Sequence, residues 1–412
     1  MIEFDERPSQ LGTNIKIVGV GGAGGNAVNT MIDNGLVGVE FIAANTDISD
    51  LKKSQANMKL QIGKKLTRGL GTGADPDKGY RSAEESKDDI RSHLEGADMV
   101  FIAAGMGGGT GTGAAPMVAK IAREMDILTL GIVTSPFVFE GKKRHTNAEE
   151  GIRNLSEFVD TLILIPNNKL NEIYGDLPMV EAFEKADNVL YEAAKAVSDI
   201  INLSGFINVD FADVKAVMAN MGYALMGTGH ASGEDRAVIA AKDAINNPLL
   251  SDINLSGCQS LLINITAGRD IVMSEFEEVN NVIVNETGSA ANIIMGVIID
   301  ENYSDQISVT IIATGLQRNE SGSTISFPQI TPPPAREKAK QKPIAAAAPA
   351  PAAIPEEITP TKSYDPDDLQ SIFDRLDFNK REEQIEIPTP EIEESKPLNP
   401  RSDLPSFLKA LD

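Results

Sequence analysis

Five short apolar segments, each followed by a turn and a helical pattern, restrict the folds available to the chain up to Gly175. They occupy residues 15–20, 39–44, 98–104, 128–133 and 161–165. The apolar residues within each segment are mostly continuous, which is typical of parallel strands buried on both faces. Helical segments separate the strands, so residues 1–177 predict an α/β, Rossmann-like domain with a parallel sheet.

A long helical pattern and a second folded unit follow this domain. Apolar residues recur at about helical spacing over residues 178–204, which predicts one long central helix. Residues 205–317 predict an α+β domain. Its expected helices lie near 213–221 and 236–245, and its expected strands at 260–266, 291–299 and 308–313. A further helix is expected with Phe276, Val279 and Ile283 on one face, opened by a capping box from Ser274 to Glu277.

The composition changes after Arg318. Residues 318–400 are rich in Pro and Ala around 331–361, and such a segment buries too little apolar surface to offset the entropy of ordering it. We therefore predict a disordered C-terminal tail, made of a flexible linker and a partner-binding tip at 401–412. Within the linker, residues 365–376 have the start signals and apolar spacing of a short amphipathic helix, either a docking element or a transient solvated helix.

Charge and cysteine content exclude several classes of function. The chain has 37 basic and 60 acidic residues, a net charge of −23, which argues against nucleic acid and against anionic membrane as direct partners. Cys258 is the single cysteine, so neither an intrachain disulfide nor a multi-cysteine zinc site is available. The start is acidic and no segment reaches the roughly 18 apolar residues of a transmembrane helix. We expect a soluble, cytoplasmic protein without direct membrane insertion.

A glycine-rich loop at Gly19–Asn26 lies between the first strand and the first helix. Glycines let backbone N–H groups approach phosphates, and the following helix N-terminus adds partial positive charge. Taken alone, this loop is the fingerprint of a dinucleotide fold, with Asp47 near the place of a ribose-binding acid. On this loop alone, a nicotinamide dinucleotide is favoured over GTP.

A second loop, Gly105–Gly113, changes that preference. It contains six glycines in nine residues, with Thr110 and Thr112 as hydroxyl donors. Packing of a helix against a strand explains one or two glycines but hardly six, so we predict that both loops bind one triphosphate. Neither loop has the Walker pattern. A third cluster, Gly69–Ala74, either lines the same pocket or forms a mobile turn.

Two charged motifs are candidates for chemistry. The run from Glu140 to Arg144 follows the fourth strand, where one acid and one guanidinium can hold a ribose and a phosphate. Asp210 and Asp213 are spaced i, i+3 before a predicted helix. Such carboxylates can orient water or hold a cation, but ordinary helix capping by Asp210 explains them slightly better.

The chain resembles the tubulin/FtsZ family over residues 13–317. Gly107–Gly113 reads GGGTGTG and resembles the tubulin signature loop, Gly21–Asn26 reads GGAGGN, and Asn208–Val214 reads NVDFADV and resembles the synergy loop. The resemblance favours GTP over a dinucleotide and a functional pair at Asp210 and Asp213. It implies a GTPase that binds GTP or GDP with Mg²⁺.

The same resemblance implies roles for single residues. Glu140 and Arg144 match the ribose and nucleotide contacts, Asp187 matches the guanine contact, and Phe183 is a candidate to stack on the base. The implied phosphate contacts are Gly22, Ala23, Gly24, Gly25, Asn26, Gly109, Thr110 and Gly111.

The resemblance also implies assembly. Asp210 and Asp213 of one molecule, assisted by Asn208, would complete the site of the next, with Asp213 polarising the attacking water. The subunits would stack head to tail into filaments of a cell-division ring beneath the membrane. A relative that binds GTP and assembles without turnover is the main alternative.

The C-terminal tip resembles the family's peptide that docks on membrane adaptors of the FtsA and ZipA type. The matching residues are Asp403, Leu404, Pro405, Phe407 and Leu408. Lys409 stands where the family often has arginine. His145, next to Arg144, is a further unusual residue without an assigned role.

Overall fold

The computed structural model describes residues 12–203, 209–250, 255–287 and 291–316. The N-terminal half contains β1 Ile15–Val20, α1 Gly21–Asp33, β2 Val39–Asn45, α2 Ile48–Lys53, β3 Met58–Gln61, α3 Lys64–Thr67, α4 Pro76–Glu85, α5 Lys87–Leu94, β4 Met99–Gly105, α6 Thr110–Glu124, β5 Leu128–Ser135, η1 Val138–Glu140, α7 Lys142–Ser156, β6 Thr161–Pro166 and α8 Asn167–Tyr174. The C-terminal half contains α9 Met179–Asn202, α10 Phe211–Met218, β7 Gly222–Ser232, α11 Arg236–Ile245, η2 Leu255–Gly257, β8 Ser260–Ala267, α12 Met273–Thr287, β9 Asn292–Ile299, η3 Glu301–Tyr303 and β10 Gln306–Thr314.

One sheet runs through both halves, in the order β3-β2-β1-β4-β5-β6-β7-β10-β8-β9. The strands from β3 to β7 are parallel, whereas β10 is antiparallel to both β7 and β8. The five strands and the long central helix predicted from the apolar segments are all present. The expected α/β fold with two domains is confirmed, although the predicted domain boundaries remain predictions.

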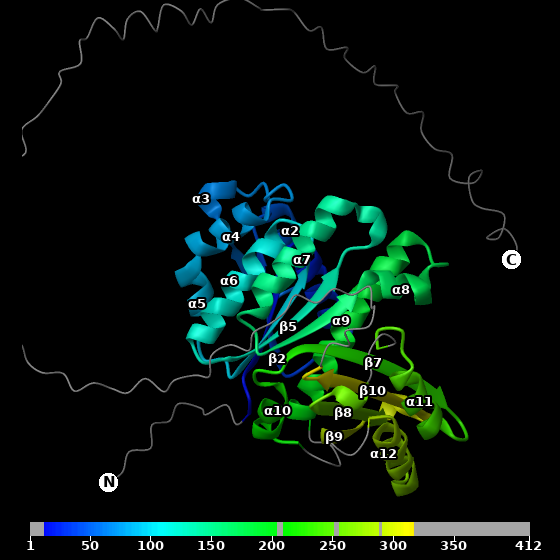
Figure 1. The fold of residues 1–412 in the computed structure, drawn as a ribbon. Helices are drawn as coiled ribbons and strands as arrows, with labels where there is room; N and C mark the ends of the chain where they lie inside the picture. The colour runs from blue at the N-terminus through cyan, green and yellow to red at the C-terminus, as the bar shows by residue number, and fades with distance from the viewer. Residues whose placement is uncertain (1–11, 204–208, 251–254, 288–290, 317–412) are drawn as a thin grey trace, which may run out of the picture. The chain divides into compact units, whose positions relative to one another are not determined.

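The N-terminal part of the sheet is buried on both faces, as its continuous apolar strands predict. Ile15 and Ile17 of β1 belong to the core on the α1 and α9 face. Val18 and Val20, which point the other way, belong to the core under α4 to α7. Figure 1 shows these helices and α9 on the two sides of the strands.

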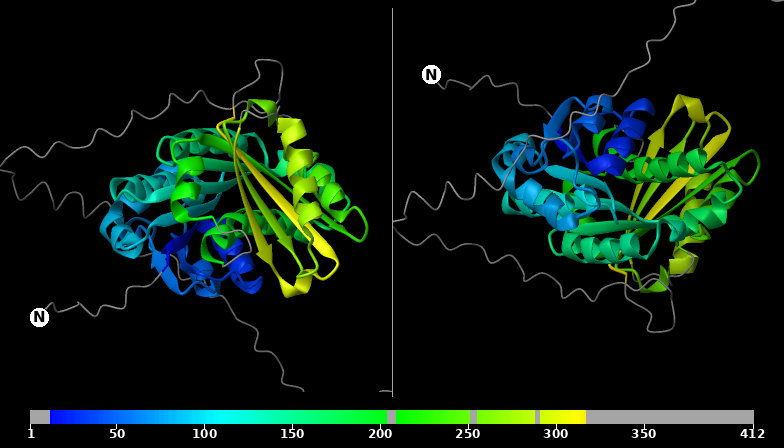
Figure 2. Two further views of the ribbon diagram at one scale, coloured as in Figure 1. Left: turned by 90° about the horizontal axis from the view of Figure 1, so that it is seen from below. Right: turned by 90° about the horizontal axis from the view of Figure 1, so that it is seen from above.

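Two strands were missed from the sequence, and β7 is the more instructive. It contains Gly222, Gly227 and Gly229, which lower strand propensity. A Cβ at Gly227 would lie 2.2 Å from the carbonyl oxygen of Ala244, and one at Gly229 would lie 2.1 Å from that of Ala240. These glycines let the backbone of α11 approach the strand. Figure 2 shows α11 and α12 together on one face of β7 to β10.

The predicted capping box of α12 is wrong by two residues. The helix begins at Met273, and Glu275 Oε2 accepts a hydrogen bond of 2.9 Å from the N–H of Val272. Glu275 also pairs with the buried guanidinium of Arg236, 2.6 Å away. Val279 and Ile283 are fully buried, so the predicted apolar face is confirmed.

Several predicted segments lie outside the described residues: Asn208, the linker with residues 365–376, and the tip at 401–412. Within the described ranges, no helix combines the length and apolar character that crossing a membrane requires.

Candidate active site

The first two glycine-rich loops meet at the carboxyl edge of the parallel sheet. α1 begins at Gly21 directly after β1, and α6 begins at Thr110 just after β4. Gly21 has φ +77°, and a Cβ there would lie 2.8 Å from the backbone nitrogen of Gly111. A Cβ at Gly105 would lie 2.6 Å from the Cβ of Ala23. The N-termini of α1 and α6 therefore lie side by side, and their free N–H groups suit an anion.

The glycines of the second loop serve packing more than the sequence suggested. A Cβ at Gly109 would lie 2.0 Å from Thr72 Oγ1, and one at Gly113 would lie 2.0 Å from the carbonyl oxygen of Pro76. Similar approaches occur at Gly105, Gly107 and Gly111. Only Gly108, among the six, has nothing within 4 Å of a Cβ. The expectation that packing cannot explain these glycines is therefore wrong.

The predicted phosphate contacts divide into open and packed positions. Gly22, Ala23 and Asn26 are exposed, and a Cβ at Gly25 would meet nothing within 4 Å. Gly24 is buried, and its Cβ would lie 2.3 Å from the carbonyl oxygen of Ala103. Gly109, Thr110 and Gly111 are also buried. We call these open positions together with Gly108 the phosphate cradle; sequence reasoning left out Gly108, although it belongs to the second loop, which lies beside the first.

The third glycine cluster packs against the second loop. Thr72 is buried, and its Oγ1 lies 3.4 Å from Thr110 Oγ1. Gly71, Gly73 and Ala74 have positive φ angles, which hold this segment in a tight turn. The cluster therefore packs against the second loop, and whether it also lines the nucleotide pocket stays a prediction.

Glu140 and Arg144 form one ion-paired unit beside the second loop. Glu140 Oε2 accepts from Arg144 at 2.5 Å, and Oε1 accepts from the N–H of Phe137 at 2.9 Å. A Cβ at Gly107 would lie 2.8 Å from the carbonyl oxygen of Arg144, so α7 is in contact with the loop. The structure thus brings this predicted pair to the phosphate loops.

An aromatic cluster connects this pair to the central helix. Phe137 stacks on Phe139 at 5.1 Å and meets the ring of Phe183 edge-on at 5.2 Å. Phe183 is 40% exposed, so part of its side chain is accessible to a ligand. Asp187 follows one turn later on α9 and therefore lies on the same face. Burial, with a smaller contribution from the charge of Glu184, raises the pKa of Asp187 to about 7.

Asn167 is a polar residue of this edge that sequence reasoning missed. It directly follows β6 and is 5% exposed. Its Oδ1 has no hydrogen-bond partner within the described part of the chain. A buried orphan acceptor is costly, and a nucleotide hydroxyl or N–H can satisfy it. Its place at the carboxyl end of a parallel strand was the signal that could have identified it.

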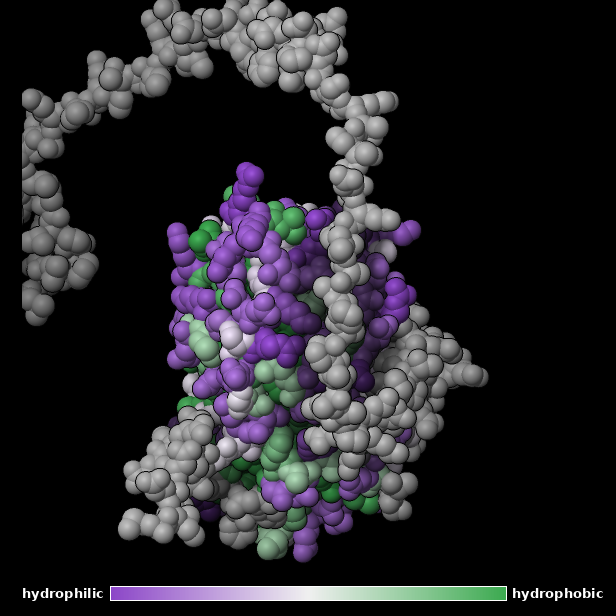
Figure 3. All heavy atoms as spheres, turned by 90° about the vertical axis from the view of Figure 1, so that its left-hand side faces the viewer, coloured by the Kyte–Doolittle hydropathy of each residue, from purple (hydrophilic) through white to green (hydrophobic). Residues whose placement is uncertain are grey.

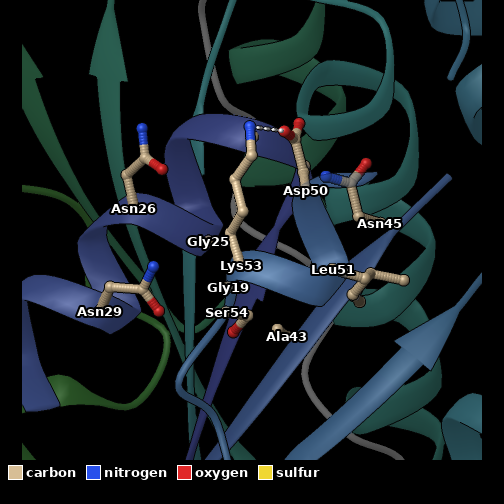
Figure 4. A pocket seen from close by; sticks show the side chains of 13 residues that line it. Gly19, Gly25, Asn26, Asn29, Ala43, Asn45, Asp50, Leu51, Lys53 and Ser54 are labelled. Carbon is tan, nitrogen blue, oxygen red and sulfur yellow. Dashed lines mark ion pairs between the residues drawn. The ribbon is translucent and has the colours of Figure 1, made fainter. Parts of the chain in front are cut away.

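A pocket of about 200 Å³ opens between α1 and α2 (Figure 4). Gly22, Gly25 and Asn26 line it, and Lys53 pairs with Asp50 at 3.6 Å on its α2 side. Glu140, Arg144, Phe183 and Asp187 do not line it. Asp47, the possible ribose-binding acid of a dinucleotide fold, instead caps α2 by accepting from the N–H of Ser49 at 2.8 Å.

Asp210 and Asp213 lie at the opposite edge of the parallel sheet. The end of α10 contacts the amino end of β6, where the hydroxyl of Thr161 donates to the carbonyl oxygen of Met218. Asp210 caps α10, and its Oδ1 accepts from the N–H of Asp213 at 2.8 Å. Both residues are exposed. Capping therefore occurs as expected, and it leaves the carboxylate of Asp213 directed to the surface without a hydrogen-bond or ion-pair partner among the described residues.

Comparison with known proteins identifies the family. The model of the Tubulin/FtsZ family, GTPase domain, matches residues 14–175, and that of the FtsZ family, C-terminal domain, matches residues 222–317. The chain is 50% identical over 323 residues to the cell division protein FtsZ of Coxiella burnetii, covering 78% of this chain and 83% of that protein.

Solved structures agree with this assignment. An FtsZ dimer from M. jannaschii is 42% identical with a TM-score of 0.73, covering 78% of this chain and 96% of that one. A GTPγS-bound protofilament of CetZ2 from Haloferax volcanii has a TM-score of 0.65 over 75% of this chain and 95% of that one. Its 22% identity shows the shared fold alone. The chain therefore belongs to the tubulin/FtsZ family of guanine-nucleotide-binding GTPases and carries both domains of an FtsZ-type cell-division protein.

Proposed function

We propose that the chain hydrolyses GTP at a junction between two copies stacked head to tail. One observation carries the proposal: the phosphate cradle and the exposed acid pair lie at opposite edges of the same parallel sheet. Asp213 therefore cannot reach a phosphate bound in its own subunit. A second copy, placed with its α10 edge against the cradle, supplies the acid. Because such a contact uses two different surfaces, it repeats and builds a filament.

Self-association among similar proteins supports this contact. Figure 3 shows hydrophilic residues predominating over the upper part of one face and hydrophobic residues becoming more frequent lower down. Two of the similar solved structures are an FtsZ dimer and a CetZ2 protofilament, so self-association occurs among relatives.

Within the proposed site, the N–H groups of α1 and α6 hold the phosphates through Gly22, Ala23, Gly25 and Asn26 on one side and Gly108 and Thr110 on the other. Gly24, Gly109 and Gly111 are packed positions, where a Cβ would meet Ala103, Thr72 and Gly105, respectively. Their direct phosphate contacts, implied by the family resemblance, remain part of the proposal.

The base and ribose lie toward α9 in this proposal. The paired Glu140 and Arg144 contact the ribose and the phosphates, and Phe183 stacks on guanine. The carboxylate of Asp187 accepts from the N1–H and N2–H groups of the base. Asn167 Oδ1 gains the hydrogen-bond donor that the described residues do not provide.

Asp213 of the neighbouring subunit orients and polarises the attacking water, with Asp210 and Asn208 assisting. Mg²⁺, when bound, neutralises charge on the phosphates. No cluster of three or more His, Cys, Asp or Glu side chains suited to a metal occurs within the described ranges.

We further propose that the filament acts at the division site on the cytoplasmic face of the membrane. The Coxiella relative is named a cell division protein, which supports this role. The tip residues Asp403, Leu404, Pro405, Phe407 and Leu408 are proposed to dock on adaptors of the FtsA and ZipA type. Deleting residues 401–412 should then abolish recruitment to midcell while GTP turnover in solution stays unchanged.

Phosphate release measured against protein concentration, with GTP and Mg²⁺, tests the central claim. A site shared between subunits gives a threshold followed by a steep rise in turnover. Turnover strictly proportional to protein concentration would mean that each molecule carries a complete site. Assembly with bound GTP and no phosphate release would favour a relative that binds but does not hydrolyse.

A further inference from the structure

Three threonine hydroxyls meet beneath the phosphate loops. Thr46 follows β2, Thr72 lies in the third glycine cluster, and Thr110 opens α6. Thr46 Oγ1 lies 2.7 Å from Thr110 Oγ1, and Thr72 Oγ1 lies 3.4 Å from the same atom. The three residues are 0%, 7% and 8% exposed, respectively, so all three are buried. Three separate loops therefore converge on the side-chain oxygen of Thr110.

Burial fixes the direction of these hydrogen bonds. A hydroxyl has one hydrogen to donate and two lone pairs to accept, and a buried donor without an acceptor is costly. Within the described residues, Thr110 Oγ1 is the hydrogen-bond partner of both Thr46 Oγ1 and Thr72 Oγ1, and neither has another. Each hydroxyl thus donates to Thr110, which accepts both. Neither contact uses the hydrogen of Thr110 itself.

The backbone of Thr46 is held as well. Its carbonyl oxygen lies 3.3 Å from Oγ1 of the buried Thr67, which shares its one hydroxyl hydrogen between this oxygen and the carbonyl oxygen of Gly63 at 3.0 Å. Thr46 is fully buried, and within the described residues its hydroxyl has no hydrogen-bond partner besides Thr110 Oγ1. Its orientation is a property of the fold and does not depend on the nucleotide.

We propose that Thr46 and Thr72 are positioning residues for nucleotide binding: by donating to Thr110 Oγ1, they direct the hydroxyl hydrogen of Thr110 toward a phosphate oxygen. This inference rests on the proposed function, in which Thr110 contacts phosphate. Hydrogen bonds in a chain polarise one another, so the two incoming bonds strengthen the outgoing one. The outgoing bond ends on a charged oxygen, where it is about twice as strong as a neutral bond.

Thr46→Val removes the donor and nearly keeps the side-chain volume. We expect GTP affinity to fall by up to about tenfold, the effect of Thr110 losing its hydrogen bond to a charged phosphate oxygen when its hydroxyl is no longer directed there. Thr46→Ser keeps the hydroxyl and should restore most of the affinity. Thr72→Val, which removes the longer contact, should give a smaller loss and is the second variant if Thr46→Val folds poorly. Equilibrium GTP titration of the full chain below the assembly threshold measures each value.

Thr129→Val is the matched control. Thr129 is also fully buried, and its hydroxyl donates to the carbonyl oxygen of Ile127 at 3.0 Å, near the amino end of β5. Removing the hydroxyl of Thr129 should lower thermal stability as Thr46→Val does, while GTP affinity stays unchanged. Equal affinity losses in the two variants would mean a general structural effect and would overturn the proposal.

Thr110→Val separates this inference from the proposed function. Unchanged GTP affinity in Thr110→Val would remove Thr110 from the phosphate site, and the proposed function would need revision there. Weakened binding in Thr110→Val with normal binding in both Thr46→Val and Thr72→Val would overturn the inference alone. Since Thr46 acts through Thr110, the double variant should bind no more weakly than Thr110→Val. Additive losses would contradict the relay.

Discussion

The two edges of the parallel sheet hold their functional groups in different ways. At the carboxyl edge, a Cβ at Gly109 or Gly113 would lie 2.0 Å from a neighbouring atom, and three buried hydroxyls fix the phosphate loops. At the amino edge, Asp213 is exposed, and Asp210 is held by one capping bond. Substitutions at the first edge therefore combine effects on folding and binding. Substitutions at the second edge change catalysis with little effect on the fold.

The largest expected effect is at the exposed edge. Asp213→Ala should lower kcat by roughly 10²–10⁴-fold, the contribution of a positioned acid–base group. GTP affinity and thermal stability should stay near those of the unchanged chain, because the carboxylate has no partner within its own described subunit. Steady-state phosphate release and a GTP titration measure the two quantities. Equal losses of binding and turnover would contradict a role across the junction.

A mixture of two inactive variants sharpens this prediction. Gly25→Asp puts a negative charge into the open cradle without a backbone clash and should abolish phosphate binding. Its Asp213 remains intact, so it can complete the site of an Asp213→Ala neighbour. Random mixing would make about a quarter of the junctions active in a head-to-tail filament. If sedimentation shows both variants in the same polymer and no turnover returns, each subunit carries its own acid.

At the carboxyl edge, alanine substitution of two neighbouring glycines should have different effects, mainly on stability at Gly109 and mainly on GTP binding at Gly108. Gly109→Ala must displace Thr72 and should lower the free energy of unfolding by about 1–3 kcal/mol, as overpacking does. Gly108→Ala meets open space, so unfolding should change by at most about 0.5 kcal/mol while GTP binding weakens. Chemical denaturation and GTP titration compare them. Similar stability losses would show that the cradle at Gly108 is not open.

This contrast also shows what the sequence could predict. The five strands and the long helix follow from continuous apolar segments and helical spacing, which are local signals. The density of glycines drew attention to the second loop, which lies beside the first in the structure. It could not distinguish packing glycines from Gly108, because the distinction depends on Thr72 and Pro76 from distant segments. The dinucleotide interpretation of the first loop was wrong, and Asp47 proved to be a helix cap. For Asn167, the one indication in the sequence was its position directly after a predicted parallel strand.

The base side of the site should depend on pH through Asp187. Burial raises the pKa of its carboxyl to about 7 in the folded protein without nucleotide, whereas the ordinary value in the unfolded chain is 3.8. Between these two pH values the folded protein keeps the carboxyl proton and the unfolded chain has released it. Stability from this group therefore decreases as pH rises from about 4 to 7. Guanine requires the ionised form, so GTP affinity should fall up to about tenfold per pH unit below 7.

Asp187→Asn is the control for that titration. It should remove this pH dependence and weaken GTP binding. The carboxylate has two acceptor oxygens for the N1–H and N2–H groups of guanine, whereas the amide has one acceptor oxygen and an NH₂ group that can only donate. Xanthine carries a carbonyl where guanine has its N2 amino group, so XTP should bind Asp187→Asn better than GTP does. Titrations with both nucleotides at pH 6 and 8 measure this. An unchanged GTP affinity in the variant would place the base elsewhere.

The smallest effect is expected at Asp210. Asp210→Ala removes the cap of α10 and should lower the free energy of unfolding by about 1 kcal/mol, whereas Asp210→Ser should keep most of it. If Asp210 also assists catalysis across the junction, both variants lose turnover alike, since serine caps the helix without supplying a carboxylate. Thermal denaturation and phosphate release on the two variants separate the roles. If turnover falls in Asp210→Ala but not in Asp210→Ser, in parallel with stability, Asp210 serves as a helix cap alone. Asp213 would then be the sole described acid acting across the junction.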